Sequence, residues 1–494
     1  MNETESSSIS VAAFVAIPPE RIKLLATEQN GQFDVTVIGA GPGGYVAAIR
    51  GAQLGLRVAL VEKDKQLGGT CGLRGCIPTK QMLMSAHVYE QTQHAASFGV
   101  QVGEVRLAFD EVLKRKNAVV NKNAKGVEFL MKKNKITTFK GAARISGQGK
   151  IEVTGEDGKK QTIDTKNIII ATGSVVRPIK GFETDGNLVI NSDQILDMPE
   201  VPKSMIVMGA GAVGIEFASV YSRFGCDTTV VELMPRILPG EDEEISAELQ
   251  KAYRKRKVKL QVDTKLEGLE KTDKGVVLTG KTSKGEAVKL EAEKLLVAVG
   301  RAPYTEGLGL EGTKVKLERG YVQVDENLRT GEPGVYAIGD VINTPWLAHV
   351  ASKEGIFVVE QIAGRHAEPI NYRRVPSCTY CDPEVASVGL TEAKARELGY
   401  DVKTGKFPFS ASGKARILGE EEGFVKVVSE SKYDEILGVH IMGPHATELI
   451  AEACVAMQLE STAEELGRTM HAHPTISEAV MEAAEGVHNL TIHF

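Results

Sequence analysis

Hydrophobic and polar positions follow one another in a block that occurs twice along the chain. The first block has an apolar run at residues 33–39, a glycine-rich turn, a helix-forming run at 45–55 and a second apolar run at 57–63. The second block repeats this order at 205–209, 215–225 and 228–232, about 170 residues later. Each block predicts a buried strand, a tight turn, a helix and a second strand, which together begin a βαβ unit.

Other apolar runs place further strands around these blocks. Residues 163–170, 295–299 and 334–338 each read as a strand that leads to a glycine. After about residue 350 the pattern changes, since 385–392, 424–430 and 435–443 predict an antiparallel sheet and 446–460 predicts a helix. We therefore expect an α/β chain with two Rossmann-like units and a C-terminal α+β domain. At roughly 150 residues per domain, 494 residues fit about three domains.

Both turns carry the pattern GxGxxG in the context that dinucleotide binding requires. The glycines are Gly39, Gly41 and Gly44 in the first turn, and Gly209, Gly211 and Gly214 in the second. They allow the tight turn, the approach of a pyrophosphate and close packing of helix on strand. A tight turn without a ligand is the alternative, and it is the weaker one because the context is satisfied twice.

An acidic residue follows the third glycine by 18 positions in each block. These residues, Glu62 and Glu232, would accept hydrogen bonds from ribose hydroxyls. Since a carboxylate repels a 2′-phosphate, Glu232 predicts NAD rather than NADP, although Arg236 could soften that preference. Asp340, after a later strand, could contact another polar chain such as a flavin ribityl.

Composition and charge exclude several function classes. The net charge of −6 and the single tryptophan argue against a polyanion partner for the chain as a whole and against a stacking nucleic-acid binder. Residues 1–30 have no basic segment before the apolar run 11–17, and no stretch approaches the ~20 apolar residues of a membrane span. We expect a cytoplasmic protein with a short N-terminal extension, and we expect no membrane or nucleic-acid partner.

Six cysteines are too few for a secreted disulfide framework, and only two of them stand close together in a distinctive motif. Cys71 and Cys76 are five positions apart, which on a regular helix means a rise of about 7.5 Å and a rotation of about 140°. A disulfide needs closer Cα atoms, so the segment must distort, and Gly72 and Gly75 permit this. A bridge of this kind is labile, which predicts a redox-active disulfide rather than a structural staple or a metal site.

The other four cysteines carry a weaker signal. Cys378 and Cys381 have CxxC spacing but fall in the predicted antiparallel region, and we interpret them as buried or strand cysteines rather than redox or metal ligands. Cys226 and Cys454 lie in apolar runs and are expected to be core thiols.

Thiol–disulfide exchange needs a base, because the thiolate is the nucleophile. The segment 471–478 offers His473 and, five residues later, Glu478, which could hold the imidazole in one tautomer. The histidines of this segment could instead be capping or interface groups. Lys80 and Glu216 are single charges beside apolar motifs, and they could be solvated or could pair near a cofactor.

These motifs together resemble the flavin-dependent pyridine nucleotide-disulfide oxidoreductases, and within them the branch that oxidises dihydrolipoamide. The sequences GGTCGLRGCIPTK at 68–80 and HAHPTISE at 471–478 are the most specific to that family. The resemblance extends from about Phe33 to the C-terminus. CGLRGC differs in its inner residues from the commoner CLNVGC, and the second cysteine pair is unusual, but every catalytic group is retained.

The resemblance implies a set of cofactor sites. It places FAD on Gly39, Gly41, Gly44, Glu62, Lys80, Gly141, Thr172, Gly173, Ser174, Asp340 and the segment Trp346, Leu347, Ala348 and His349. It places NAD on Gly209, Gly211, Gly214, Glu216, Glu232, Leu266 and Gly300. Glu216 would pair with Lys80 beside the flavin, and no metal is implied. His473 would reach the Cys71–Cys76 disulfide of the other subunit of a homodimer, with Glu478 orienting it.

The domain boundaries expected from this resemblance follow the predicted blocks. Residues 1–30 form the extension, 31–178 and 302–371 the two parts of the FAD-binding domain, 179–301 the NAD-binding domain, and 372–494 the dimerisation domain. The implied activity is oxidation of protein-bound dihydrolipoamide with NAD⁺, as the shared component of 2-oxoacid dehydrogenase-type complexes. The partner would be a lipoylated acyltransferase or an H-protein-type carrier.

Two alternative functions remain open at the level of the sequence. One is an NAD(P)H-dependent reductase of a small disulfide, similar to glutathione reductase, and the other is a non-catalytic flavoprotein subunit. Related glutathione and trypanothione reductases carry arginines where this chain has Glu232, and mercuric reductases need a cysteine pair near the C-terminus, whereas no cysteine follows Cys454.

Overall fold

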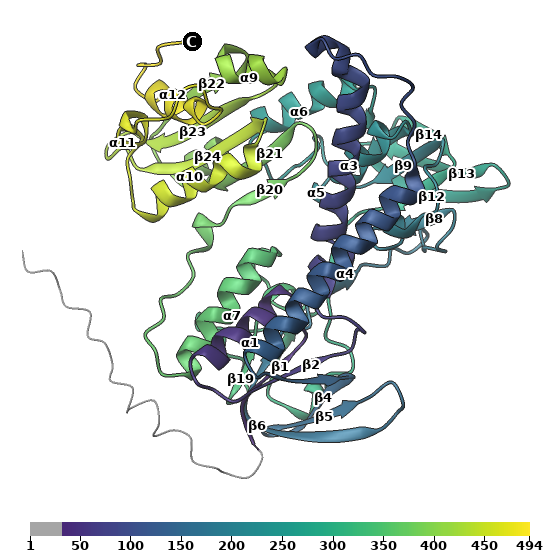
Figure 1. The fold of residues 1–494 in the computed structure, drawn as a ribbon, viewed down its shortest axis with the longest axis vertical. Coiled ribbons are helices and arrows are strands. Elements are labelled where there is room, and N and C mark those ends of the chain that lie inside the picture. Colours follow the sequence, from purple (N-terminus) through teal and green to yellow (C-terminus); the bar gives the residue numbers. More distant parts are fainter. Residues whose placement is uncertain (1–31) are drawn as a thin grey trace, which may run out of the picture.

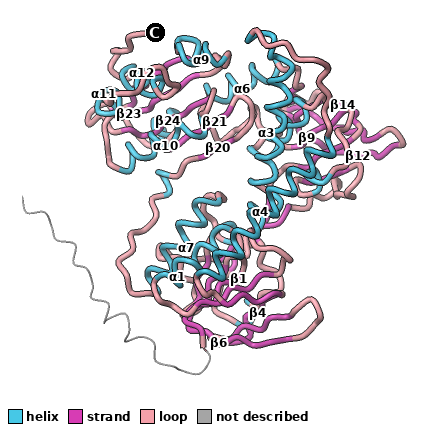
Figure 2. The backbone as a smooth tube through the Cα atoms, in the orientation of Figure 1, coloured by secondary structure: helices cyan, strands magenta, loops and turns pink. Residues whose placement is uncertain are grey.

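The computed structural model describes residues 32–494, and its strands form three main sheets flanked by helices (Figures 1 and 2). The predicted N-terminal extension lies outside the described residues. Within residues 32–494, no helix is both long enough and apolar enough to cross a membrane.

The first sheet has seven strands and combines two distant parts of the sequence. Its order is β3-β2-β1-β6-β5-β4, with β19 paired to β6. The pairs β2–β1, β1–β6 and β6–β19 are parallel. The bounds are β1 Phe33–Ile38, β2 Val58–Glu62, β3 Thr137–Lys140, β4 Ala142–Gly147, β5 Lys150–Thr154, β6 Lys160–Ile170 and β19 Val335–Ala337. The sequence therefore returns to this sheet after more than 160 residues.

Helices α1 (Pro42–Gln53) and α7 (Ala348–Ile362) pack against each other beside this sheet (Figure 1). Two glycines make the close approach possible, because a Cβ atom on Gly355 would lie 2.6 Å from the carbonyl oxygen of Gly43. Arg50 on α1 also donates to Glu360 on α7 at 2.5 Å. The second part of the sheet is thus fixed to the first by backbone contact as well as by β19.

The second sheet lies in the middle of the sequence. Its order is β11-β10-β9-β15-β8, with every neighbouring pair parallel. The strands are β8 Val189–Asn191, β9 Ser204–Met208, β10 Asp227–Val231, β11 Lys259–Gln261 and β15 Lys294–Val297, with helices α5 Ala212–Arg223 and α6 Glu243–Lys255. An antiparallel sheet of β12 Thr264–Thr272, β13 Gly275–Thr282 and β14 Ala287–Ala292 is attached to it.

The C-terminal unit is an antiparallel sheet of order β20-β21-β24-β23-β22, as its alternating pattern predicts. The bounds are β20 Ser377–Thr379, β21 Glu384–Gly389, β22 Val402–Pro408, β23 Phe424–Glu430 and β24 Ile436–Gly443, with helices α8 Glu392–Glu397, α9 Gly413–Leu418, α10 Ala446–Gln458, α11 Ala463–Arg468 and α12 Glu478–Gly486. A short pair links distant segments, β7 Ser174–Val176 with β16 Arg301–Pro303, and β17 Leu317–Glu318 forms a local hairpin with β18 Tyr321–Val322.

Three helices between β2 and β3 were not predicted from the sequence. They are α2 Gly69–Arg74, α3 Cys76–His94 and α4 Phe109–Lys133. Helix α3 packs on both α4 and α5, so it joins the first unit to the second. The predicted domain boundaries remain proposals, although each main sheet is built from segments inside one predicted domain.

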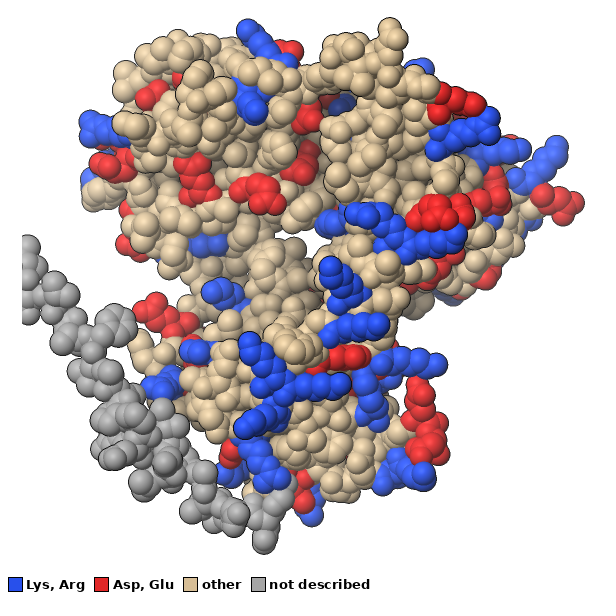
Figure 3. Space-filling view, viewed as in Figure 1, with Lys and Arg blue, Asp and Glu red and all other residues tan. Residues whose placement is uncertain are grey.

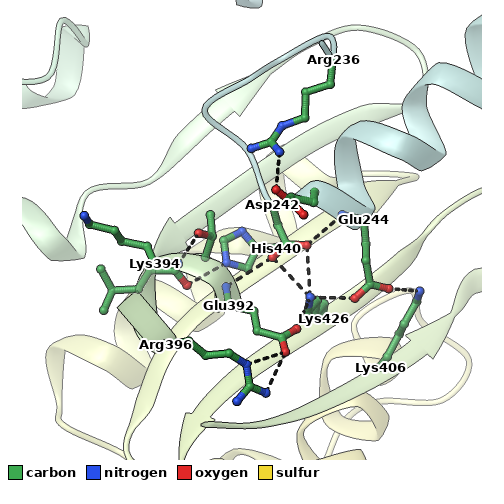
Figure 4. Close-up of polar contacts among 12 residues, drawn as sticks. Arg236, Asp242, Glu244, Glu392, Lys394, Arg396, Lys406, Lys426 and His440 are labelled. Carbon is green, nitrogen blue, oxygen red and sulfur yellow. Dashed lines mark hydrogen bonds and ion pairs between the residues drawn. The ribbon is translucent and has the colours of Figure 1, made fainter. Parts of the chain in front are cut away.

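A buried ion cluster ties the second unit to the C-terminal sheet (Figure 4). The ammonium of Lys426 on β23 lies 3.2 Å from Asp242, 2.7 Å from Glu244 and 2.8 Å from Glu392. Burial alone would lower the pKa of Lys426, but the surrounding carboxylates raise it well above the ordinary value. Removing Lys426 would leave the buried carboxylate of Asp242 without its cation, at a cost of roughly 3–5 kcal/mol. The contact therefore fixes how the two units meet.

Candidate active site

The first glycine turn has the backbone that a phosphate-binding loop requires. Gly39 has φ +106°, and a Cβ atom there would lie 2.3 Å from the carbonyl oxygen of Ala171. Gly44 is equally restricted, because its Cβ atom would lie 1.8 Å from the oxygen of Gly39. Pro42 begins α1 directly after the turn, so the helix N-terminus points amide groups toward a phosphate.

Glu62 is held at the end of β2 beside this turn. Its carboxylate accepts hydrogen bonds from the amides of Ala40 at 2.6 Å and Asp64 at 2.8 Å. Burial nevertheless raises the pKa of Glu62. The carboxylate is therefore desolvated and oriented, as a group that accepts from ribose hydroxyls must be.

A cavity of about 440 Å³ extends from this turn to the cysteine pair. It brings together most of the residues predicted for FAD and two of those predicted for catalysis. The predicted residues that line it are Gly39, Gly41, Glu62, Cys71, Cys76, Lys80, Gly141, Thr172, Gly173, Ser174, Glu216, Asp340, Trp346, Leu347 and Ala348. Gly44 and His349 are not among its lining residues, and the His349 ring lies 2.9 Å from the carbonyl oxygen of Pro376 instead.

Asp340 forms one end of a polar network that the sequence did not reveal. Burial raises the pKa of Asp340, and its carboxylate accepts from the Ser174 hydroxyl at 2.6 Å. Arg301 donates to the same hydroxyl at 2.8 Å. Glu354, fully buried on α7, accepts from the Gly339 amide at 2.6 Å. Helix α7 also contains Glu360, so no sequence signal set Glu354 apart.

The second glycine turn repeats the geometry of the first. Gly209 also has φ +106°, and Cβ atoms on Gly209 and Gly214 would meet the oxygens of Ala298 at 2.6 Å and Gly209 at 2.0 Å. Glu232 accepts from the Ala210 amide at 2.7 Å, just as Glu62 accepts from Ala40. The two loops are therefore equivalent in structure as well as in sequence.

The remaining residues predicted for NAD are spread around this second turn. Gly211 precedes α5 as its N-cap residue, Gly300 has φ +106° with open space around it, and Leu266 lies on β12. Leu266 packs against a small hydrophobic core of the second unit. Their contact with NAD remains a prediction.

The cysteine pair lies where one helix ends and the next begins. Helix α2 ends at Arg74 and α3 begins at Cys76, with Gly75 between them at φ −138° and ψ −111°. A Cβ atom on Gly75 would lie 3.4 Å from the Cα atom of Cys71, so glycine permits the close approach. The distortion that the sequence required is therefore a helix break at Gly75, whereas Gly72 has open space around it.

Both cysteines are free thiols in this structure, and their environments differ. A hydrogen bond from Cys71, assisted by the positive charge of Lys80, lowers the pKa of Cys76 to about 7 against burial. The same hydrogen bond and burial raise the pKa of Cys71 far above its ordinary value. Cys76 is also the first residue of α3, where the helix dipole favours an anion. Of the two cysteines, Cys76 is therefore the one that ionises more readily to a thiolate.

This asymmetry predicts a titration of the two-electron-reduced protein. The rate of Cys76 alkylation by iodoacetamide should rise with pH through a midpoint near 7, because the thiolate forms as the proton leaves. Cys226 is a matched control, since burial raises its pKa to about 12 and it should stay unmodified. A midpoint near the ordinary thiol value of 9.0 would contradict the proposed role of Cys71 and Lys80.

Lys80 and Glu216 form the ion pair that the sequence left open. The Lys80 ammonium lies 2.8 Å from both carboxylate oxygens of Glu216, joining α3 to α5. Tyr380 closes the pair, since its amide donates to Glu216 at 2.9 Å and its ring lies 4.4 Å from the ammonium. Cys378, two residues before Tyr380, also lines the cavity, whereas Cys381 is buried and is not among its lining residues.

His473 and Glu478 form a hydrogen-bonded pair at the molecular surface. The His473 Nδ1 atom lies 2.8 Å from Glu478, whose other oxygen accepts from the Thr475 amide at 2.8 Å. Although burial opposes it, the hydrogen bonds from Thr475 and His473 lower the pKa of Glu478. The His473 side chain is 80% exposed and does not line the cavity of its own chain. The geometry thus fits a base that is offered to another subunit.

Both the sequence and the fold of this chain are similar to those of named proteins and of a described protein family. Residues 33–355 match the family described as pyridine nucleotide-disulphide oxidoreductase, and residues 375–484 match its dimerisation domain. The dihydrolipoyl dehydrogenase of Bacillus subtilis is 47% identical over 473 residues, covering 94% of this chain and 99% of the relative. The mitochondrial dihydrolipoyl dehydrogenase of Pisum sativum is 42% identical, covering 93% of this chain and 92% of the relative.

A solved structure extends the similarity to the whole fold. The crystal structure of LpdA from Mycobacterium tuberculosis has a TM-score of 0.85 and 27% identity, covering 91% of this chain and 99% of that chain. The resemblance and the fold class predicted from the motifs are therefore confirmed. This chain belongs to the pyridine nucleotide-disulphide oxidoreductase family and carries its dimerisation domain.

Proposed function

We propose that this enzyme oxidises protein-bound dihydrolipoamide to lipoamide and reduces NAD⁺ to NADH, with FAD as resident cofactor. The observation that carries the proposal is the cysteine pair, which lines the cavity next to the Lys80–Glu216 ion pair and contains one stabilised thiolate. The relatives named dihydrolipoyl dehydrogenase support the substrate.

The residues of the cavity fit a flavin dinucleotide. The turn at Gly39–Gly44 offers a pyrophosphate site, Glu62 offers a ribose acceptor, and Asp340 offers a buried carboxylate for a second polar chain. Lys80 and the cysteines lie at the redox end of the same cavity. When bound, FAD supplies the transfer of two electrons from a dithiol to NAD⁺ as hydride.

The chain's own residues carry out the sulfur chemistry in this proposal. One thiolate of the substrate attacks Cys71 of the disulfide, and the bond between the two cysteines breaks so that Cys76 leaves as a thiolate. The second substrate thiol then displaces Cys71, which closes the lipoamide disulfide and leaves two electrons on the cysteine pair. His473 of the partner subunit takes the proton from the first attacking thiol, and Glu478 holds its ring. The proton of the second thiol passes to the departing Cys71 sulfur, whose raised pKa favours the thiol.

The partner and the location are also part of the proposal. The dimerisation domain brings two copies together, and the lipoyl group comes from a lipoylated acyltransferase or H-protein-type carrier. We place the enzyme in the cytoplasm, since six cysteines are too few for the disulfide framework of a secreted protein.

The direct test measures NAD⁺ reduction by FAD-loaded protein, first with free dihydrolipoamide and then with reduced lipoylated carriers. Turnover with both substrates is expected. Turnover with a small disulfide and NADPH, but not with dihydrolipoamide, would favour the glutathione reductase-like alternative. Absence of turnover with every dithiol and disulfide would favour a non-catalytic flavoprotein subunit.

Nucleotide preference gives a separate prediction. The wild-type enzyme should use NAD⁺ at least about 100-fold better than NADP⁺ in kcat/KM, because the Glu232 carboxylate repels a 2′-phosphate. Arg236 does not offset this, since its guanidinium lies 2.6 Å from Glu243 and also donates to the Pro239 carbonyl. Steady-state rates for wild type and Glu232→Gln check it, and the variant should discriminate less. Equal use of both nucleotides by the wild type would contradict the role of Glu232.

A further inference from the structure

The exposed face of helix α4 carries a row of cations. We name it the α4 stripe and define it by Arg115, Lys122, Lys125, Phe129, Lys132 and Lys133, all of which are exposed. At 100° per residue these positions fall within about 120° of the helix circumference, and they extend over roughly 27 Å. The opposite side of α4 is buried and includes Val120, Ala124 and Met131. The stripe is therefore one continuous outer face.

The cations of the stripe have no ion-pair partners. Within the described residues, neither a hydrogen bond nor an ion pair is found for the side chains of the five stripe cations, although many other surface lysines are paired, such as Lys259 with Asp227. Lys114, at the N-terminal end, is neutralised by Glu111 at 2.6 Å. Glu128 is the one carboxylate between residues 115 and 135, and it is only partly exposed at the edge of the stripe.

The stripe opposes the charge of the molecule as a whole. The full chain has a net charge of −6, yet residues 115–135 contain seven Lys and Arg and one Glu. Figure 3 shows Lys and Arg side chains gathered over the region where Figure 1 draws α4. Such a local field, with like charges held together on one helix, attracts an acidic surface and accelerates its association.

The helix that carries the stripe packs on the two helices that carry the cysteine pair. Helix α4 packs on α2, the short helix that holds Cys71, and on α3, which begins at Cys76. Asn121, at the edge of the stripe, accepts a hydrogen bond from Gln66 at 2.9 Å, in the loop just before α2. A protein bound to the stripe would therefore be held one helix away from the element that carries the reactive disulfide.

We propose that the α4 stripe is a docking surface for an acidic face of the protein that carries the dihydrolipoyl group. This inference rests on the proposed function. The dihydrolipoyl amide itself has no charge for the stripe to attract, so the stripe acts only on the carrier. A single narrow row with Phe129 at its centre, 63% exposed, suits a folded protein, since nucleic-acid grooves use several stacking aromatics.

The test compares two substrates in one variant. Lys122→Glu/Lys125→Glu/Lys132→Glu is assayed as FAD-loaded enzyme with free dihydrolipoamide and with a recombinant dihydrolipoyl domain of net negative charge. At about 0.05 M ionic strength, kcat/KM for the domain should fall about tenfold or more, whereas the value for free dihydrolipoamide should stay within about twofold. The difference should largely disappear at about 1 M salt, where the Debye length is near 3 Å.

A matched control has the same change in net charge. Lys257→Glu/Lys274→Glu/Lys284→Glu replaces three exposed turn lysines of the second unit and should leave both substrates unaffected. A second arm uses the lipoyl domain with its exposed Asp and Glu changed to Asn and Gln, which should react slowly with wild type and be insensitive to the stripe substitutions.

Three results would overturn the proposal. The first is an unchanged kcat/KM for the acidic domain in the stripe variant. The second is an equal loss in the matched control. The third is a stripe that binds a single-stranded oligonucleotide in a salt-dependent way while the lipoyl domain is unaffected. Failure of the proposed function looks different, because wild-type enzyme would then show no turnover with free dihydrolipoamide at all.

Discussion

Replacing Cys76 with serine is expected to abolish NAD⁺ reduction by dihydrolipoamide and to remove the long-wavelength absorbance of the two-electron-reduced protein. A serine hydroxyl can neither form a disulfide nor become an anion at neutral pH. The variant therefore lacks the disulfide that accepts electrons from the substrate and the thiolate that donates them to the flavin. Turnover should fall by at least about 10³-fold, as for loss of an essential nucleophile. FAD content should be unchanged, because Cys76 is only one of the many residues that line the cavity proposed for the cofactor.

Two further cysteine variants test whether the thiolate of Cys76 causes the long-wavelength absorbance. Cys71→Ser should also stop turnover, yet it should show the absorbance before any reduction, because Cys76 is then already a free thiolate beside oxidised FAD and a serine hydroxyl can still donate to it. Cys454→Ser makes the same chemical change outside the cavity and should be active. A Cys76→Ser protein with normal absorbance on two-electron reduction would refute the assignment of the two sulfurs.

Replacing His473 with glutamine should lower kcat for dihydrolipoamide by about 10²–10⁴-fold, which is the usual contribution of a positioned general base. Electron transfer from NADH to an artificial dye should be retained, because that reaction does not require deprotonation of a dithiol. His366→Gln is a control, since this exposed histidine has no place in the site. Equal losses in the two reactions would contradict the role as base.

Subunit mixing tests where His473 acts. A heterodimer of one Cys76→Ser chain and one His473→Gln chain has one intact site if each histidine serves the other subunit's disulfide. It has none if both groups act within one chain. Activity that appears on mixing two inactive variants is therefore the expected result. Its absence would contradict the proposal that the exposed His473 acts on the disulfide of the other subunit.

The parts of the site that could be predicted from sequence are those fixed by local geometry. The glycine turns and the acids Glu62 and Glu232 could be predicted because they belong to one short strand–turn–helix–strand pattern. The two members of the His473–Glu478 pair are only five positions apart in the sequence. The helix break at Gly75 could likewise be inferred, because a regular helix cannot bring positions 71 and 76 together.

The parts that could not be predicted depend on distant contacts. Arg301 reaches Ser174 across 127 positions, and Tyr380 reaches Glu216 across 164, so no local pattern marks either one. Helix α4 was also missed, although its apolar positions have helical spacing, because its cationic face reads as an ordinary solvated surface. The ion cluster around Lys426 depends on three segments that meet only in the folded chain.

The split of the first sheet determines the order in which the units can mature during synthesis. The strands of the second sheet are complete once residue 297 has left the ribosome, but the first sheet still lacks β19 and the α7 cover of α1. The first sheet therefore stays incomplete until about residue 362 has emerged. Until then one edge of β6 and one face of α1 are exposed to solvent. Domains generally fold as units during synthesis, so here the middle of the chain is able to reach its native state before the beginning.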